Sequence, residues 1–348
     1  MAEAVQIYAG THEGLVVYRP NGSGWVESSR AFEGAIIDSI TGCRDQPERV
    51  FVGVTHDGLY RTVDAGAHWE RVLDGDVRSI AVDATDEVVY AGLEPVHLHR
   101  SVDRGATWQE VESLVQMPEA IRQRWWSPVT GVGHIRHIFV HPDDANTIYL
   151  ALEHGGIVRS FDAGATWEDV TNGIDYIDIH MVACLPGSRS RYYASSARGF
   201  YTSEDPADGW VRAEQGFTRD YFHDYAFLPP HRAGESPTML IGTADHSPGS
   251  WNRPERARSA VFRSDDAAQS WRRVGVGLAE EITAMVSTIV THPMDADSAF
   301  LGLGEVSRGH AHGPAGPGHI LVTRDRGDSW QDLNFELPAD RVLWVAPA

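Results

Sequence analysis

The sequence has few cysteines, few basic residues for its acid content and no long apolar run. Cys43 and Cys184 are its only cysteines and lie outside any metal-binding spacing, so we expect free thiols in a reducing cytoplasm. The chain of 348 residues carries 29 Lys and Arg against 49 Asp and Glu, a net charge of −20. This charge argues against nucleic acid and against an anionic membrane surface as partners. No apolar stretch approaches membrane-spanning length, so we expect no membrane association.

One eight-residue pattern, Ser/Thr-x-Asp-x-Gly-x-Thr/Ser-Trp, recurs along the chain. A carboxylate directly after a strand can accept hydrogen bonds from the backbone of the turn that follows. The glycine supplies a backbone conformation that a side chain would oppose, and the tryptophan lays a large apolar face between neighbouring hairpins. The pattern therefore predicts hairpin turns in which the aspartate is structural. Its copies, in one of which alanine replaces the glycine, occupy residues 62–69, 101–108, 160–167, 264–271 and 323–330.

These repeats resemble the Asp-box (BNR) repeat of sialidases, sortilin-type receptors, xyloglucan-degrading hydrolases and photosystem assembly factors. The resemblance implies a β-propeller. It says little about the reaction, because the Asp-box turns of such proteins lie away from their functional sites.

The repeats divide the whole chain into blades of four short strands, A to D, with the octet between C and D. If the chain starts on a B strand, the run Arg341–Ala346 supplies the A strand that the first blade lacks. The sequence thus predicts one domain over residues 1–348. We expect an all-β, seven-bladed β-propeller of four-stranded antiparallel blades, whose ring is closed by the C-terminal strand completing blade one. Each blade is marked by a tryptophan: Trp25, Trp69, Trp108, Trp167, Trp210, Trp271 and Trp330.

Three long insertions interrupt the blade rhythm at residues 112–133, 244–259 and 305–318. The first joins a D strand to the next A strand, and the other two are B–C loops. In a four-stranded meander all three emerge on the face opposite the Asp boxes. Long loops in a compact fold commonly act as lids or binding loops, so we expect a covered site on that face.

Aligning the A strands places one polar residue of each blade near the mouth of the central channel. A shift of one residue would exchange His223 for Asp224, or His137 for Arg136. The ring is either a hydrated channel of mutually satisfied ion pairs or a site for a small anionic molecule. Arginine suits the second hypothesis because its guanidinium binds a carboxylate bidentately. The aligned residues are Arg341, Asp38, Arg78, Arg136, His180, Asp224 and Ser287.

Histidines with nearby carboxylates recur at the start of the B–C loops, on the same face as the ring. They are either polar turn residues before a glycine or ligands of one divalent cation on the axis. Neutral imidazoles suit Zn, Fe, Mn or Cu, with carboxylates as orienting partners. The candidate metal ligands are His12, His56, His154 and His246.

Sialidases use three arginines on a carboxylate and an Arg-Ile-Pro motif. Tyr18-Arg19-Pro20 is only a partial echo of that motif, and seven blades depart from the usual six. We therefore expect another hydrolase or a lyase, acting on a small anionic substrate at the channel mouth. The alternative is a non-enzymatic propeller that binds a protein or peptide. In the enzyme hypothesis the catalytic candidates are His180, Asp224, Asp38 and Glu153, and the substrate-binding candidates are Arg78, Arg136, Arg341, Tyr221 and Trp126.

Overall fold

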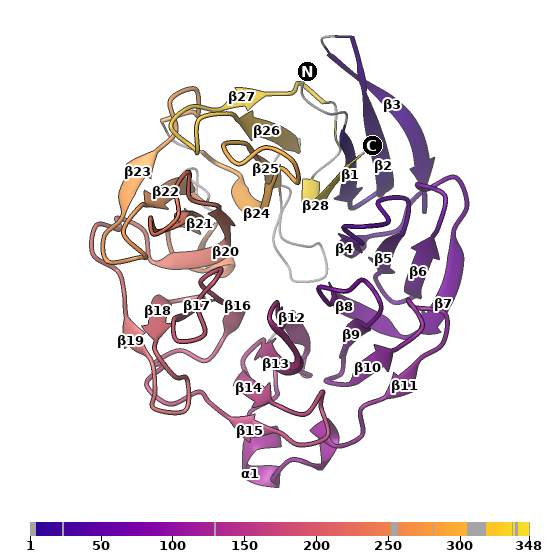
Figure 1. The fold of residues 1–348 in the computed structure, drawn as a ribbon, viewed down its shortest axis with the longest axis vertical. Helices are drawn as coiled ribbons and strands as arrows, with labels where there is room; N and C mark the ends of the chain where they lie inside the picture. The colour runs from indigo at the N-terminus through magenta and orange to yellow at the C-terminus, as the bar shows by residue number, and fades with distance from the viewer. Residues whose placement is uncertain are drawn as a thin grey trace.

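Seven four-stranded antiparallel sheets are arranged around a central axis in the computed structural model (Figure 1). This confirms the predicted seven-bladed propeller. The structure describes residues 5–22, 24–128, 130–251, 257–280, 282–304, 318–335, 337 and 340–347, the last range without its side chains. Among the described residues, no helix combines the length and the apolar character that crossing a membrane requires.

Six blades consist of four consecutive strands, ordered from the channel outwards. Blades two to four are β4 (Ile37–Gly42), β5 (Val50–Val54), β6 (Gly58–Thr62) and β7 (Glu70–Asp74); β8 (Asp76–Val82), β9 (Val89–Glu94), β10 (Leu98–Ser101) and β11 (Gln109–Glu110); and β12 (Ile135–His141), β13 (Asp144–Leu152), β14 (Gly156–Ser160) and β15 (Glu168–Asp169). Blades five to seven are β16 (Ile179–Cys184), β17 (Tyr192–Ser196), β18 (Gly199–Ser203) and β19 (Val211–Arg212); β20 (Tyr221–Leu228), β21 (Thr238–Ala244), β22 (Ala260–Ser264) and β23 (Arg272–Val274); and β24 (Met285–Thr291), β25 (Ala299–Gly304), β26 (His319–Thr323) and β27 (Gln331–Asp332).

The first blade joins the two ends of the chain. Its sheet order is β28-β1-β2-β3, with β1 (Val5–Thr11), β2 (Gly14–Asn21), β3 (Gly24–Ala31) and β28 (Asp340–Pro347). β28 pairs antiparallel with β1 from Val5↔Pro347 to Thr11↔Asp340. The predicted closure of the ring by the C-terminal strand is therefore confirmed, and the N- and C-terminal ends lie in one blade (Figure 1).

The Asp boxes form the predicted hairpin turns. In each, one carboxylate oxygen accepts the backbone N–H of the residue four positions later at 2.8–2.9 Å. The hydroxyl two residues earlier also donates to the carboxylate, as Ser160 does to Asp162 at 2.8 Å. The backbone hydrogen bond from His68 is the largest cause that lowers the pKa of Asp64, to about 2. A carboxylate whose donors all stabilise its ionised form holds a turn and does not exchange protons near neutral pH.

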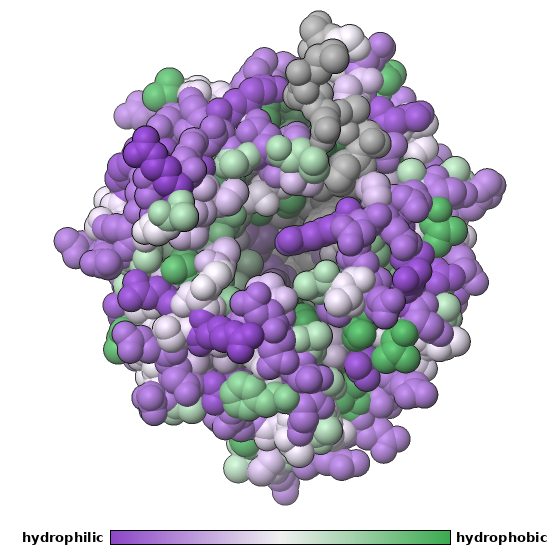
Figure 2. Space-filling model, in the orientation of Figure 1, coloured by the Kyte–Doolittle hydropathy of each residue, from purple (hydrophilic) through white to green (hydrophobic). Residues whose placement is uncertain are grey.

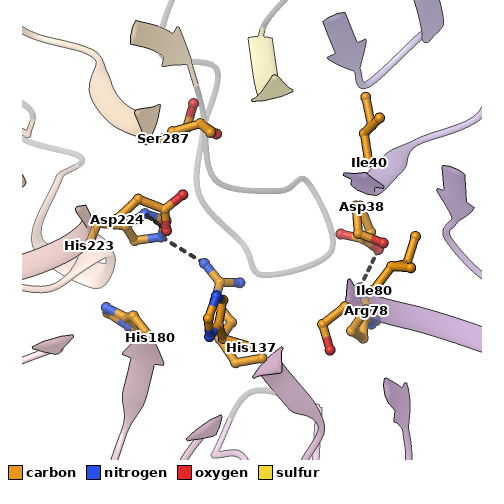
Figure 3. Close-up of a pocket in the computed structure, with 13 residues that line it drawn as sticks. Asp38, Ile40, Arg78, Ile80, His137, His180, His223, Asp224 and Ser287 are labelled. Atoms are coloured by element: carbon orange, nitrogen blue, oxygen red, sulfur yellow. Dashed lines mark hydrogen bonds and ion pairs between the residues drawn. The ribbon is translucent and has the colours of Figure 1, made fainter. Parts of the chain in front are cut away.

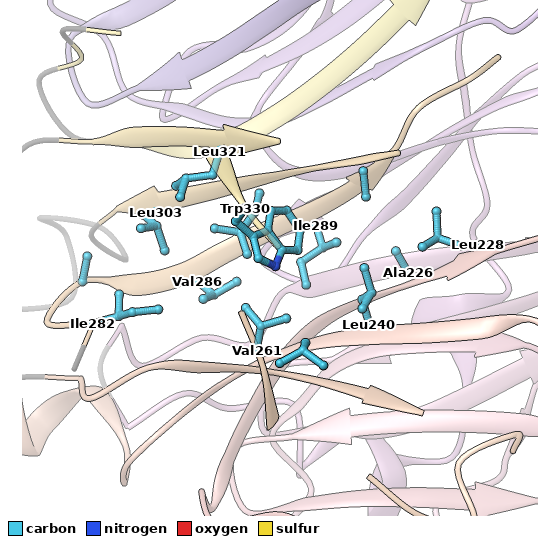
Figure 4. Close-up of a cluster of buried hydrophobic side chains, with 14 residues drawn as sticks. Ala226, Leu228, Leu240, Val261, Ile282, Val286, Ile289, Leu303, Leu321 and Trp330 are labelled. Carbon is cyan, nitrogen blue, oxygen red and sulfur yellow. The ribbon is translucent and has the colours of Figure 1, made fainter. Parts of the chain in front are cut away.

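Apolar side chains fill the space between neighbouring blades. In Figure 4, Trp330 of blade seven packs in one cluster with Val286 and Ile289 of β24 and with Leu240 and Val261 of blade six. The cluster shows why each repeat carries a tryptophan: its ring covers apolar surface that one four-stranded sheet leaves exposed.

The innermost strand of every blade contains a β-bulge at its axial ring position. In blade two, Ile37 pairs with Val54 and Ser39 with Gly53, which leaves Asp38 as the extra residue. A bulge bends its strand and redirects the side chain of the extra residue. The register shift recurs in all seven blades, so the fold turns one polar residue, or two adjacent ones, of each blade out of the ladder. The extra residues are Asp38, Arg78, Arg136, His180, Ser287 and Arg341, with His223 and Asp224 sharing the bulge of blade six.

Gly53, opposite the bulge of Asp38, has no room for a side chain. A Cβ there would lie 2.6 Å from the carbonyl oxygen of Val77 on the next blade and would also meet the Ser39 hydroxyl. We expect Gly53→Ala to lower the free energy of unfolding by about 1–3 kcal/mol, because overpacking forces backbone shifts. Urea denaturation measures this loss. The control is Gly24→Ala, whose Cβ would meet only the Asn21 carbonyl oxygen at 3.9 Å, and equal stability of the two variants would contradict the expectation.

The insertions differ in their relation to the channel. Residues 112–133 contain the 3-10 helix η1 (Leu114–Gln116) and α1 (Glu119–Arg122), and α1 lies at the outer perimeter beyond β15 (Figure 1). Arg124 pairs with Asp169 of β15 at 2.8 Å, so this part of the segment braces the outer edge and does not cover the channel as a lid would. In the second insertion, η2 (Pro248–Ser250) precedes Trp251. Residues 305–317, with Glu305 and the His310-Ala-His312 motif, lie outside the described residues.

Candidate functional site

A cavity of about 230 Å³ lies on the propeller axis, and its lining includes every axial ring residue whose side chain the structure describes. Figure 2 shows a face that is hollowed at its centre and mostly hydrophilic. In Figure 3, His180, His223 and Asp224 lie on one side of the pocket, and Asp38 and Arg78 lie on the other. The bulges thus bring together Asp38, Arg78, Arg136, His137, His180, His223, Asp224 and Ser287.

Arg78 is held in a cage of three buried carboxylates. Its guanidinium lies 2.7 Å from Asp38, 3.0 Å from Asp76 and 3.1 Å from Glu94. Asp38 also accepts a hydrogen bond from the Thr55 hydroxyl. The expectation that Arg78 binds an anionic substrate is not supported by this geometry, because the surrounding carboxylates already exceed its charge.

The carboxylate cage continues into the next blade through His134, which directly precedes β12. Its Nδ1 lies 3.2 Å from Glu94 Oε2, and its Nε2 lies 2.9 Å from Glu153 Oε2. Although burial opposes the charge, the two carboxylates, Glu153 foremost, raise the pKa of His134 to about 9. His134 is therefore a buried cation between two anions at neutral pH.

Glu153, His154 and Asp178 meet where the B–C loop of blade four faces the start of blade five. Among the described residues, these three form the one group of His, Cys, Asp and Glu whose possible ligand atoms all lie within 4.8 Å of one another. Asp178 is 9% exposed, and its Oδ1 accepts no hydrogen bond from any residue that the structure describes. Burial, and then the charge of Glu153, raise the pKa of Asp178. Two carboxylates and one imidazole in this arrangement can hold a divalent cation.

The hydrogen bonds of His180 and His223 determine their tautomers. His180 Nδ1 lies 2.6 Å from the carbonyl oxygen of Phe222, so Nδ1 carries the proton. Its Nε2 lone pair faces the Tyr221 hydroxyl at 3.4 Å and Asp178 Oδ1 at 3.8 Å. Arg136 donates to His223 Nε2 at 2.7 Å, which leaves the His223 proton on Nδ1 toward Asp224. Burial lowers the pKa of both histidines, so they are neutral acceptors at neutral pH.

The predicted four-histidine metal site does not form. His56 has a 77% exposed side chain and pairs with Asp76 at 2.8 Å, and His246 is 61% exposed and pairs with Asp220 at 3.1 Å. His12 is buried but outside the group around His154. His56 pairs with a residue of the next blade and His246 with a residue of its own blade, so equal positions in the repeat do not bring the rings together.

The structure places neither Trp126 nor the side chain of Arg341 at the axial cavity. Trp126 is 55% exposed and does not line the cavity. The backbone of Arg341 occupies the bulge of β28, but its side chain lies outside the described residues. Tyr221 is buried against His180 and contacts Trp251 edge-on.

Sequence reasoning missed Asp178, His134 and Asp76. Each stands two residues before an axial ring residue: His180, Arg136 and Arg78 respectively. Residues two apart on a strand lie on the same side of the sheet. That alternation, applied one step further toward the strand start, would have predicted a second polar layer above the ring.

Seven blades, Asp-box turns and a polar axial pocket define the chain as a repeat propeller, with a fold similar to that of a GH74 xyloglucanase and of YCF48. Within this class, residues 140–342, more than half of the chain, match the DUF6242 beta propeller domain. The chain belongs to this family.

Individual relatives cover the chain to different extents. The oligoxyloglucan-reducing end-specific xyloglucanase of Emericella nidulans is 26% identical over 234 residues, 62% of this chain and 25% of that protein. The GH74 xyloglucanase structure from Xanthomonas campestris has a TM-score of 0.63 at 20% identity, over 96% of this chain and 52% of that one. YCF48 bound to D1 peptide has a TM-score of 0.56 at 16% identity, over 89% and 91%. The chain thus spans a quarter of the curated relative, and the structural likenesses show the fold.

Proposed function

We propose that this propeller is a metal-assisted hydrolase that acts at the channel mouth, with one divalent cation held by Glu153, His154 and Asp178. The observation that carries the proposal is the convergence of these three side chains, together with the buried Oδ1 of Asp178, which accepts no hydrogen bond within the described part of the chain. The mixed donor set suits Zn²⁺, Mn²⁺ or Fe²⁺. The relationship to xyloglucanases, which are hydrolases, supports hydrolysis over a lyase reaction.

The neighbouring side chains can supply proton transfer. A divalent cation held by Glu153, His154 and Asp178 would supply a water of lowered pKa and would polarise a substrate oxygen. His180 is placed to accept a proton, because its Nε2 carries a lone pair 3.8 Å from Asp178 Oδ1 and its ring is oriented by the Phe222 carbonyl. His223 accepts a hydrogen bond from Arg136 at Nε2, and its Nδ1 lies 3.4 Å from Asp224 Oδ1.

The charges around the site favour an uncharged, hydroxyl-rich substrate over the anionic one expected from sequence. Arg78 is surrounded by carboxylates, and Arg136 is the one described arginine that lines the pocket without a carboxylate ion pair. Asp38, Glu94, Glu153, Asp178 and Asp224 outnumber these cations. Hydroxyl groups can hydrogen-bond to carboxylates where a second anion would be repelled.

Metal analysis of the purified protein tests the proposal. We expect about one Zn²⁺, Mn²⁺ or Fe²⁺ per chain, since one group of ligands converges. Hydrolysis of a panel of small glycosides and esters should be lost after EDTA treatment and return when the same metal is added back. Protein that takes up none of these metals after loading, and that turns over no substrate in the panel, would contradict the proposal.

One observation favours a second function. YCF48 matches this chain over nearly the full length of both, whereas the GH74 structure is about twice as long. Since the YCF48 structure contains a bound peptide, a protein or peptide ligand is the alternative for this propeller. Recovery of a stable complex in a pull-down, unaffected by Asp178→Asn and by EDTA, would favour the scaffold over the enzyme.

A further inference from the structure

We propose that His134 is a positioning residue that orients Glu153 toward the bound cation, an inference that rests on the proposed function. Its Nε2 lies 2.9 Å from Glu153 Oε2, and the residue is 2% exposed. His134 lies outside the group of converging ligands, so it acts on the cation through Glu153. A contact to Oε2 limits rotation of the carboxylate group that converges with His154 and Asp178.

His134 is itself held from its other side. Its Nδ1 lies 3.2 Å from Glu94 Oε2, and a carboxylate can only accept. Each ring nitrogen thus has a carboxylate oxygen within ion-pair distance, and the Nδ1 contact is an ion pair without hydrogen-bond geometry. A ring with one partner could swing about χ1 and χ2, whereas a ring with a partner at each nitrogen cannot do so without breaking a buried ion pair.

The support extends across three blades as a row of alternating charges. Asp38 on β4 holds Arg78 on β8 at 2.7 Å, Arg78 holds Glu94 at the end of β9 at 3.1 Å, and Glu94 faces His134 before β12. The side chains along this row are all at most 12% exposed. We call Asp38, Arg78, Glu94, His134 and Glu153 the charged row. Because its members come from strands fixed in separate sheets, the row positions Glu153 relative to the rigid framework and not to its own loop alone.

This arrangement matches the way proteins orient metal ligands. Outer groups that hydrogen-bond to a ligating side chain fix its rotamer, and their substitution typically weakens metal binding about 10–100-fold. The usual case is a carboxylate that orients a histidine ligand. Here the roles are reversed, and the histidine orients a carboxylate ligand.

The experiment measures Mn²⁺ affinity by calorimetry and the EPR spectrum of bound Mn²⁺ in the full chain. We expect His134→Gln, which keeps one N–H donor, to weaken binding about 10-fold or more, and His134→Ala to weaken it further, both with an altered EPR line shape. His141→Gln is the matched control. His141 is equally buried on β12 but lies at its other end, where its Nδ1 accepts the backbone N–H of Asp143 at 3.2 Å. Its substitution should lower the melting temperature and leave Mn²⁺ affinity within about threefold.

The outcomes separate the two claims. Wild-type protein that binds Mn²⁺ while His134→Gln binds it equally well, with the same EPR spectrum, overturns the role of His134 alone. Wild-type protein that binds none of Mn²⁺, Zn²⁺ and Fe²⁺ overturns the proposed function and this inference with it. If His134→Ala does not fold, His134→Gln decides the question, because glutamine leaves no large cavity but is uncharged and cannot form the ion pairs with Glu94 and Glu153.

Discussion

Removing residues 340–348 is expected to abolish cooperative folding of the propeller. The deletion takes away all of β28, so β1 loses a partner along its whole length and the first blade keeps three strands. β28 also contacts β24 and β4, the innermost strands of the two neighbouring blades. Each lost backbone hydrogen bond costs about 1 kcal/mol net, and the total with lost packing is comparable to the about 5–15 kcal/mol by which domains are stable.

Near-UV circular dichroism and urea denaturation at 25 °C measure this effect. We expect the truncated chain to show no sharp transition and to aggregate through the exposed edge of β1. Removal of Ala348 alone, which lies outside β28, is the control and should leave the midpoint unchanged. If both truncations unfold at the same urea concentration, the closing strand does not stabilise the ring as the strand pairing indicates.

The second large effect is expected for Asp178→Asn. The substitution keeps the shape of the side chain and removes the charge that a cation would bind, so metal affinity should fall at least about 100-fold, or about 3 kcal/mol. The free energy of unfolding of the metal-free protein should instead rise. Because burial and Glu153 raise the pKa of Asp178, the folded state of the wild type loses stability as pH rises from the ordinary aspartate range to the raised pKa. The asparagine variant lacks that loss and should be the more stable protein at pH 8.

Asp220→Asn provides the matched control for this prediction. Asp220 also pairs with a histidine, His246 at 3.1 Å, but its side chain is 60% exposed. We expect its substitution to leave metal affinity unchanged and stability within about 0.5 kcal/mol. Titration calorimetry with Zn²⁺ or Mn²⁺ and urea denaturation in EDTA at pH 5 and pH 8 give both readouts. Equal metal affinity of Asp178→Asn and wild type would place any cation elsewhere.

A more stable Asp178→Asn variant would indicate that the chain retains Asp178 for function and not for stability. A carboxylate that is buried beside another carboxylate raises the free energy of the folded state unless a cation compensates it. Proteins retain such groups where function requires them. The charged row shows the contrasting case, because its carboxylates alternate with Arg78 and His134.

The sequence alone was sufficient for the architecture because the relevant interactions are short-range. An Asp box forms from hydrogen bonds within a few residues, as between Ser160, Asp162 and Thr166. The first of the seven repeats lacks one strand, and one strand remains at the end of the chain. Placing that last strand in the first blade closes the ring. The axial ring could be predicted for the same reason, since the bulge recurs at an equal position in every blade.

Only the tertiary structure decided which charges meet. Arg78 contacts Asp38 of another blade and Glu94 of another strand, and Glu153 meets Asp178 across a blade boundary. Ion-pair partners are selected by distances of a few ångströms, and those depend on how each loop turns after its strand. His154 and His246 occupy similar places in the repeat, yet one faces buried carboxylates and the other faces solvent. Sequence periodicity determines that residues share a face of the propeller, whereas the packing of the blades determines whether they are in contact.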